Sequence, residues 1–206
     1  MDSDAPSSTF REKLDAFLRQ AAKPQDKYGH QPRLYALTLL VGKGHSYDDD
    51  VVFAAAYLHD LGVFIGHRPE EHEALFRWDH VRYAAENSPR ILADAGFPEA
   101  KIPAVLRVME THQPRDTPET VEAVILRDAD ILEQLGAVGV LRAVAKVGRD
   151  TRYQTFTPLI AFLERSLREL PTAIRLPTTR ALAAPKIALL EAFLAGVEAE
   201  ARGCLF

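Results

Sequence analysis

The sequence is poor in the residues that make covalent or soft-metal sites. It contains one cysteine, one tryptophan and two methionines among 206 residues. The single cysteine, Cys204, cannot form a disulfide within the chain, so cystine bridges play no part in the expected fold. Because the chain has no Cys-x-x-Cys pair, a zinc site built from thiolates is excluded as well.

Long apolar runs and several catalytic motifs are also missing. No stretch approaches the length of a membrane span, and the N-terminal segment is acidic and polar, unlike a secretory signal. We therefore expect a cytoplasmic protein without a membrane partner. His-Glu-x-x-His, Glu-x-x-His and Gly-x-Ser-x-Gly are absent, and the run at residues 42–46 lacks the full spacing of a phosphate-binding loop.

The chain has no basic excess. Its formal net charge is -4, which argues against a partner that is a nucleic-acid polymer. Apolar residues make up 47% and charged residues 26%, as in ordinary globular proteins. With no linker or repeat to divide it, we expect one domain over residues 1–206, and the sequence leaves homo-oligomerisation open.

What the sequence does contain is a series of helix patterns. Thr9 and Glu12 form a capping box before an apolar stripe, Pro32 suits the first turn of a second helix, and Asp48 can cap a third. The dipeptides at residues 97–98, 117–118 and 157–158 place proline at or near later helix starts. We predict an all-α bundle of about eight or nine helices, with residues 62–79 as a loop, containing one short helical turn, that could act as a lid.

The pair His59-Asp60 is the strongest single signal. It follows the apolar run from Val51 to Leu58 and precedes Leu61-Gly62. Two ionisable side chains at the end of a buried segment are costly unless something pairs with them. A divalent metal does so, because it takes a neutral imidazole and a carboxylate directly. The alternative interpretation, a solvated helix end, fits poorly with so apolar a run.

Five motifs in order carry a resemblance to a known family. They are His30-x-x-Arg33, His59-Asp60-Leu61-Gly62, His80, His112 and Asp128-Ala129-Asp130-Ile131-Leu132. This series resembles the HD-domain metal-dependent phosphohydrolases. The resemblance implies an all-helical fold with a metal at its centre, a motif core over about residues 28–135, and C-terminal helices over about residues 136–202 packed on that core.

The same resemblance implies roles for individual residues. Metal ligands would be His30, His59, Asp60 and Asp130, and the ion would be a divalent cation such as Mn, Mg, Fe, Zn, Ni or Co. Catalytic roles would belong to Asp60, His80 and His112, the two histidines binding either a second ion or a substrate phosphate. Independently, Arg33 lies one turn from His30 on the predicted helix, so its forked guanidinium could hold a phosphate oxygen. For each of these groups an ordinary structural pairing is the competing interpretation.

The late acidic pair is ambiguous. In the predicted helix from Pro118 to Leu135, the apolar stripe passes through Asp128. The family pattern instead favours Asp130 as the ligand. We take Asp130 as the ligand and expect Asp128 to orient a histidine from behind.

The function expected from this set is hydrolysis of a small phosphorylated metabolite, with a nucleotide as the preferred substrate, by metal-activated water. Two alternatives remain. One is a phosphodiesterase of the same superfamily, although the Gly-Tyr-Pro motif typical of the branch that cleaves cyclic dinucleotides is absent. The other is a regulatory module that holds a metal without turnover.

Overall fold

The architecture is helical throughout the part of the chain that the structure describes. A computed structural model describes residues 8–148 and 153–205. Within those ranges there are no strands, and the α-helices number ten, including the five-residue α4. Their bounds are α1 Phe10–Ala21, α2 His30–Val41, α3 Asp49–Leu58, α4 His72–Phe76, α5 His80–Ala95, α6 Ile102–Glu110, α7 Val121–Gln134, α8 Gly136–Val144, α9 Phe156–Ala173 and α10 Pro177–Ala201. The all-α prediction is confirmed.

Local sequence signals set several helix starts as expected. Thr9 and Glu12 form the predicted capping box of α1. The Asp48 side chain accepts hydrogen bonds from the amides of Asp50 and Val51 at the start of α3. The predicted start of α7 at Pro118 is wrong by three residues. The Thr120 side chain accepts from the amide of Ala123, and this cap sets the start at Val121.

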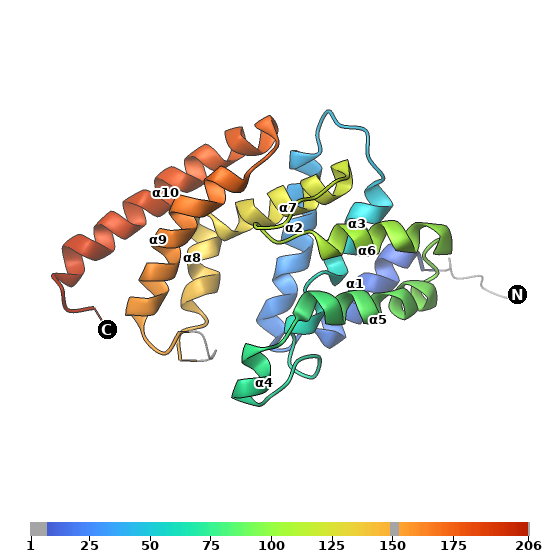
Figure 1. The fold of residues 1–206 in the computed structure, drawn as a ribbon, viewed down its shortest axis with the longest axis horizontal. Helices are drawn as coiled ribbons and strands as arrows, with labels where there is room; N and C mark the ends of the chain where they lie inside the picture. Colours follow the sequence, from blue (N-terminus) through green and yellow to red (C-terminus); the bar gives the residue numbers. More distant parts are fainter. Residues whose placement is uncertain (1–7, 149–152, 206) are drawn as a thin grey trace, which may run out of the picture.

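The helices form two groups that α7 connects (Figure 1). Helices α1, α2, α5 and α6 pack around α3, and α7 packs against α2, α3 and α6. Helices α8, α9 and α10 form the second group at the C-terminal side. Helix α10 contacts α7, α8 and α9, so the C-terminal helices pack against the end of the motif core. That these groups make up one domain stays a prediction.

Helix α3 is the buried centre of the first group. Every residue from Val51 to Leu58 is buried, which explains why its sequence is apolar on all sides. It packs against α2, α6 and α7. Because α3 ends at Leu58, the chain delivers His59 and Asp60 to the interior and not to the surface.

Candidate metal centre

His59 is fixed at the C-terminal end of α3. Its side chain is 1% exposed, and its Nδ1 donates to the carbonyl oxygen of Ala56 at 3.0 Å. A hydrogen on Nδ1 leaves Nε2 with its lone pair. The ring is therefore held in the tautomer that can bind a cation through Nε2.

His30 and His112 present their rings in the same way. The Nδ1 of His30, the first residue of α2, donates to the Glu133 carboxylate. The Nδ1 of His112, which follows α6, donates to the carbonyl oxygen of Met109 at 2.6 Å. Both side chains are buried. Three imidazoles thus have Nδ1 committed to an acceptor and Nε2 available.

The Asp60 carboxylate lies between two sets of histidines. Its Oδ2 is 3.5 Å from Nε2 of His30 and 3.6 Å from Nε2 of His59. Its Oδ1 is 3.8 Å from Nε2 of His80, the first residue of α5. The ring of His112 lies 6.0 Å from that of His80 and 4.8 Å from that of His59, measured between centroids. One carboxylate therefore faces imidazole nitrogens on both sides.

The second carboxylate comes from α7. Oδ1 of Asp130 is 3.7 Å from Nε2 of His30. Three groups of side chains in the described residues have ligand atoms close enough to share an ion: His30, His59 and Asp60; Asp60, His80 and His112; and His30, Asp130 and Glu133. The structure thus brings together all six residues that the sequence nominated as metal ligands or catalytic groups.

The donor chemistry of this cluster fits a divalent cation. Nε2 of His30 and Nε2 of His59 face each other at 3.3 Å, and both rings have Nδ1 bonded to an acceptor. Two lone pairs at this separation repel unless a cation or a shared proton lies between them. Imidazole nitrogens and carboxylate oxygens together suit Mn, Fe, Co, Ni or Zn.

Burial and charge determine the protonation of the central pair. Burial raises the pKa of Asp60, but the imidazoles of His59 and His30 lower it by more, so the net pKa is below its usual value. Burial lowers the pKa of His59 to about 3. At neutral pH the pair is therefore an ionised carboxylate beside a neutral imidazole, which is the form that metal binding requires. Burial also raises the pKa of Asp130.

Comparison with known proteins identifies the family. The model of the HD domain matches residues 28–135, which is more than half of the chain. The chain belongs to the HD domain family. No curated protein sequence matches it.

Several solved structures share the fold over almost the whole chain. The crystal structure of Bacillus subtilis YpgQ in complex with ADP is 20% identical with a TM-score of 0.68, covering 92% of this chain and 97% of that one. A predicted HD superfamily hydrolase from an uncultured Thermotogales bacterium is 22% identical with a TM-score of 0.63, covering 93% of each chain. An HD-superfamily hydrolase from Bacillus thuringiensis is 18% identical with a TM-score of 0.66, covering 93% and 96%. At these identities the likeness concerns the fold, and it extends beyond the matched HD segment into α8–α10.

Asp128 has a different position from the one expected. It is fully buried, and its carboxylate accepts hydrogen bonds from the backbone amides of Arg175 and Leu176, the latter at 2.8 Å. The prediction that it orients a histidine is wrong. Helical periodicity correctly placed Asp128 inside, but it faces the connection between α9 and α10. Asp130, two residues later, faces the HD histidines.

The carboxylate that does contact a candidate ligand histidine, His30, on its Nδ1 side is Glu133, which sequence reasoning missed. It is 2% exposed, and besides His30 it accepts from Nε of Arg33 at 2.8 Å and from Arg142. A signal was present, because Glu133 is one turn after Asp130 and adjoins the buried Leu132. Its partner His30 is 103 positions away, however, so no local pattern could pair them.

Gly62 has a steric role in the HD motif. A Cβ atom on Gly62 would lie 2.7 Å from the backbone oxygen of His80 and 2.8 Å from its Cα. The start of α5 therefore approaches the backbone just after His59-Asp60 more closely than any side chain allows. This close approach is what sets His80 beside Asp60.

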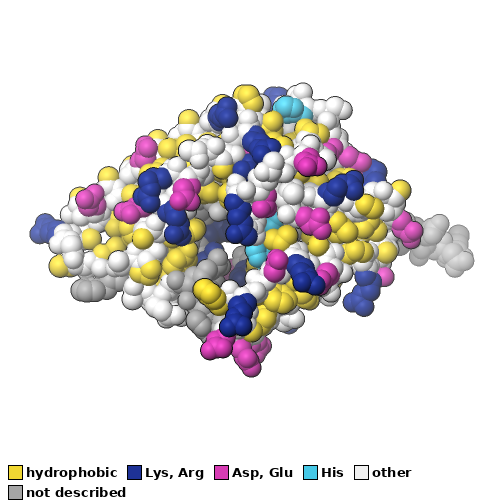
Figure 2. Space-filling view, viewed as in Figure 1, with side chains coloured by type: hydrophobic (Ala, Val, Ile, Leu, Met, Phe, Trp, Pro, Cys, Tyr) yellow, Lys and Arg dark blue, Asp and Glu magenta, His cyan; other side chains and the backbone are white. Residues whose placement is uncertain are grey.

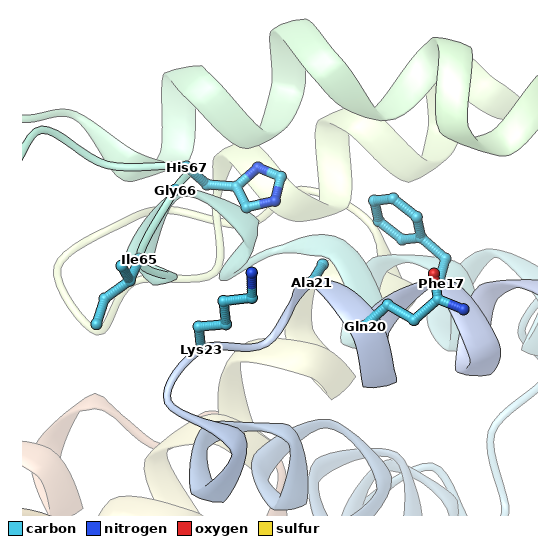
Figure 3. A pocket seen from close by; sticks show the side chains of 7 residues that line it. All are labelled: Phe17, Gln20, Ala21, Lys23, Ile65, Gly66 and His67. Atoms are coloured by element: carbon cyan, nitrogen blue, oxygen red, sulfur yellow. The ribbon is translucent and has the colours of Figure 1, made fainter.

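The segment between Asp60 and α5 contains the expected short helical turn, α4. Trp78 Nε1 donates to the carbonyl oxygen of Gly62 at 2.7 Å, and Phe76 is 89% exposed. A hollow of about 350 Å³ adjoins this segment, where Lys23 and His67 face the same space (Figure 3). None of the nominated metal ligands lines it. A lid role for the segment stays a prediction.

The face of the molecule drawn in Figure 2 is mixed in charge. Figure 2 shows a histidine near the middle of one face, with Lys and Arg side chains as well as acidic ones around it.

Among the described residues, no helix is both long enough and apolar enough to cross a membrane.

Proposed function

We propose that this HD protein is a metal-dependent phosphohydrolase that acts on small phosphorylated metabolites, with nucleotides as the substrate class. The reaction would be hydrolysis, in which water adds to phosphorus and a P–O bond breaks to release phosphate or pyrophosphate. The observation that carries the proposal is the position of Asp60, whose two oxygens face His30 and His59 on one side and His80 on the other.

The ligands of one tightly held ion would be His30, His59, Asp60 and Asp130. When bound, a divalent ion supplies positive charge for the phosphate oxygens and lowers the pKa of a coordinated water toward ~7. The chain's own contribution is to fix three imidazole tautomers and to keep Asp60 ionised before the ion arrives. Such preorganisation is what makes binding tight, because the donors need not be reoriented.

His80 and His112 would act on the other side of Asp60. The His80 side chain is 28% exposed, so it can reach a substrate phosphate from the mouth of the centre, whereas His112 is 3% exposed. A second ion could use the same two histidines with Asp60 Oδ1. Its ligands would be two neutral imidazoles and one shared carboxylate, so we propose that any second ion binds more weakly than the first.

Arg33 supplies positive charge beside the cluster. Its Nε is bonded to Glu133, and its side chain is 44% exposed, so the rest of the guanidinium fork can contact a phosphate oxygen. The ADP in the YpgQ structure supports nucleotides as the first compounds to test, at 20% identity to this chain.

The test is metal analysis of the purified protein followed by a screen for phosphate and pyrophosphate release. Nucleotides are the substrates, and Mn, Mg, Fe, Zn, Ni and Co are added singly. We expect release that depends on metal, is lost on chelation, and is lost in Asp60→Asn. The matched control is Asp94→Asn, because Asp94 is exposed on α5.

Three outcomes would contradict the proposal. Hydrolysis that continues in the presence of chelator would remove the metal from the mechanism. A metal-loaded protein that releases no phosphate from any nucleotide would favour the regulatory module instead. Release of a nucleoside monophosphate from a cyclic dinucleotide, without release from nucleotides, would favour the phosphodiesterase.

A further inference from the structure

We propose that Glu133 is a positioning residue of the metal centre: it fixes the ring of His30, while Arg33 and Arg142 hold its carboxylate in place. This inference rests on the proposed metal centre and goes beyond the nominated ligands. It assigns a role to Glu133, which contacts His30 on Nδ1 while Nε2 faces the centre. It also assigns a role to Arg142, which lies outside the matched HD segment.

The contact with His30 is suited to this role. Glu133 accepts from Nδ1 of His30, and Nε2 of the same ring lies 3.5 Å from Asp60 and 3.7 Å from Asp130. A carboxylate on one nitrogen fixes both the tautomer and the rotation of the ring, and it makes the opposite nitrogen a better donor. His59 and His112 use backbone carbonyls for this purpose. His30 is at the first position of α2, and its ring depends on a side chain instead.

A buried carboxylate needs more than one donor. Glu133 is 2% exposed, and a lone ionised group at that depth would be costly. Its Oε1 accepts from Nε of Arg33, and its Oε2 accepts from Arg142 as well as from His30. The two guanidiniums together outweigh one negative charge, so the cluster keeps a net positive charge at the edge of the centre.

The two arginines reach Glu133 from different parts of the chain. The guanidinium of Arg33 lies against Gly29, where a Cβ would come within 2.7 Å of Nη1. Because the φ angle of Gly29 is -59°, the absent side chain matters for space and not for backbone conformation. Arg142 comes from α8, beyond the end of the HD segment at residue 135. The C-terminal helices therefore contribute a side chain to the support of the centre.

The experiment measures Mn²⁺ binding by calorimetry to metal-free full-length protein. The test variant is Glu133→Gln, in which an NH₂ group replaces one carboxylate oxygen. This NH₂ group can only donate, whereas His30, Arg33 and Arg142 all present donors to the side chain. The matched control is Glu122→Gln, the same substitution at the other end of α7, where Glu122 accepts from the amide of Asp48. We expect Glu133→Gln to weaken Mn²⁺ binding by about 10–100-fold, the usual effect of losing such a partner, and Glu122→Gln to leave it unchanged.

A second readout does not involve metal at all. Nitrogen-15 NMR of the imidazoles in the metal-free protein reports which ring nitrogen carries the hydrogen. We expect His30 to be protonated on Nδ1 in the wild-type protein and to lose that preference in Glu133→Gln. Arg142→Ala should weaken Mn²⁺ binding in the wild-type background. In the Glu133→Gln background it should cause little further loss of Mn²⁺ affinity, because Arg142 acts through the Glu133 carboxylate.

Unchanged Mn²⁺ affinity in Glu133→Gln would overturn the proposal. If the wild-type protein bound no metal, the proposed function would fail. The role of Glu133 would then be tested only by the NMR measurement of the His30 tautomer. A His30 tautomer that is the same in both proteins would then overturn its positioning role. Equal losses of affinity in Glu133→Gln and Glu122→Gln would also overturn it, because that result indicates general damage to α7.

Discussion

Side chains two positions apart on α7 have different tasks. Asp128 is fully buried and accepts from backbone amides at the start of α10, whereas Asp130 lies 3.7 Å from His30. Helical periodicity predicts that Asp128 points inward, but it does not predict which group each carboxylate contacts. The separation comes from what lies opposite each carboxylate, which is backbone in one case and imidazole in the other.

Substitution of these two acids should therefore affect different properties. We expect Asp130→Asn to remove bound metal and activity while the fold persists. Asp128→Asn should lower the free energy of unfolding by about 1–3 kcal/mol, because one amide hydrogen of Arg175 or Leu176 would face an NH₂ group. Elemental analysis measures the metal content, and urea denaturation measures the free energy of unfolding. If Asp128→Asn lost its metal and Asp130→Asn kept it, Asp128 would be the ligand.

Gly62 gives a second test at the same scale. In Gly62→Ala the new Cβ would clash with the backbone of His80, so the start of α5 must shift. We expect a loss of about 1–3 kcal/mol in the free energy of unfolding, typical of overpacking. Activity should fall as well, since His80 moves away from Asp60. Gly196→Ala is the control, because a Cβ at that position of α10 meets nothing within 4 Å. Equal stability of the two variants would contradict the packing argument.

At the scale of elements, α7 connects the centre to the rest of the molecule. It carries Arg127, Asp128, Asp130 and Glu133. Arg127 is buried and donates to the carbonyl oxygens of Gln113, Pro114 and Ala173. The Arg127 side chain thereby connects the segment after His112 to the end of α9 through hydrogen bonds. Burial lowers the pKa of Arg127, but Asp128 nearby offsets part of that effect.

Removing this guanidinium should be costly. In Arg127→Met three carbonyls lose their donor, and Asp128 loses a charge 3.7 Å away. We expect a loss of about 3–5 kcal/mol, the scale for breaking one partner out of a buried ion pair. Thermal and urea unfolding provide the measurement. Arg82→Met, which removes an exposed pair with Glu86, should change stability little by comparison. A stable Arg127→Met protein would show that water replaces the guanidinium.

At the scale of the whole molecule, the centre joins helices that are distant in sequence. Its nominated ligands and catalytic residues come from the ends or interiors of α2, α3, α5 and α7 and from the segment after α6. An ion at this point would therefore link most of the first helix group. Binding to the folded state alone stabilises it by mass action.

Metal should accordingly raise the melting temperature. At free metal 100 times the dissociation constant, the gain is about 2.7 kcal/mol, which corresponds to roughly 5–10 °C for a domain of this size. Differential scanning calorimetry with Mn²⁺ and with chelator measures the shift. His59→Ala should abolish the shift while the chelated protein still melts cooperatively. The same shift in His59→Ala would place the ion elsewhere.

The sequence by itself indicated the all-α fold, several of the helices and the candidate ligands. Capping residues and apolar stripes act within a few positions, so α1 and α3 could be predicted from local patterns. His59-Asp60 at the end of a wholly apolar helix indicated a buried polar centre, and the ordered motifs indicated His30, His80, His112 and Asp130.

The tertiary structure decided what stands opposite each of these side chains. It alone pairs His30 with Glu133, brings Arg142 from α8, and sends Asp128 toward α10 while Asp130 faces the histidines. These contacts join residues as far as 103 positions apart. Helical periodicity states which face of a helix is buried. It does not state which neighbour covers that face, because the neighbour is fixed only when the helices pack.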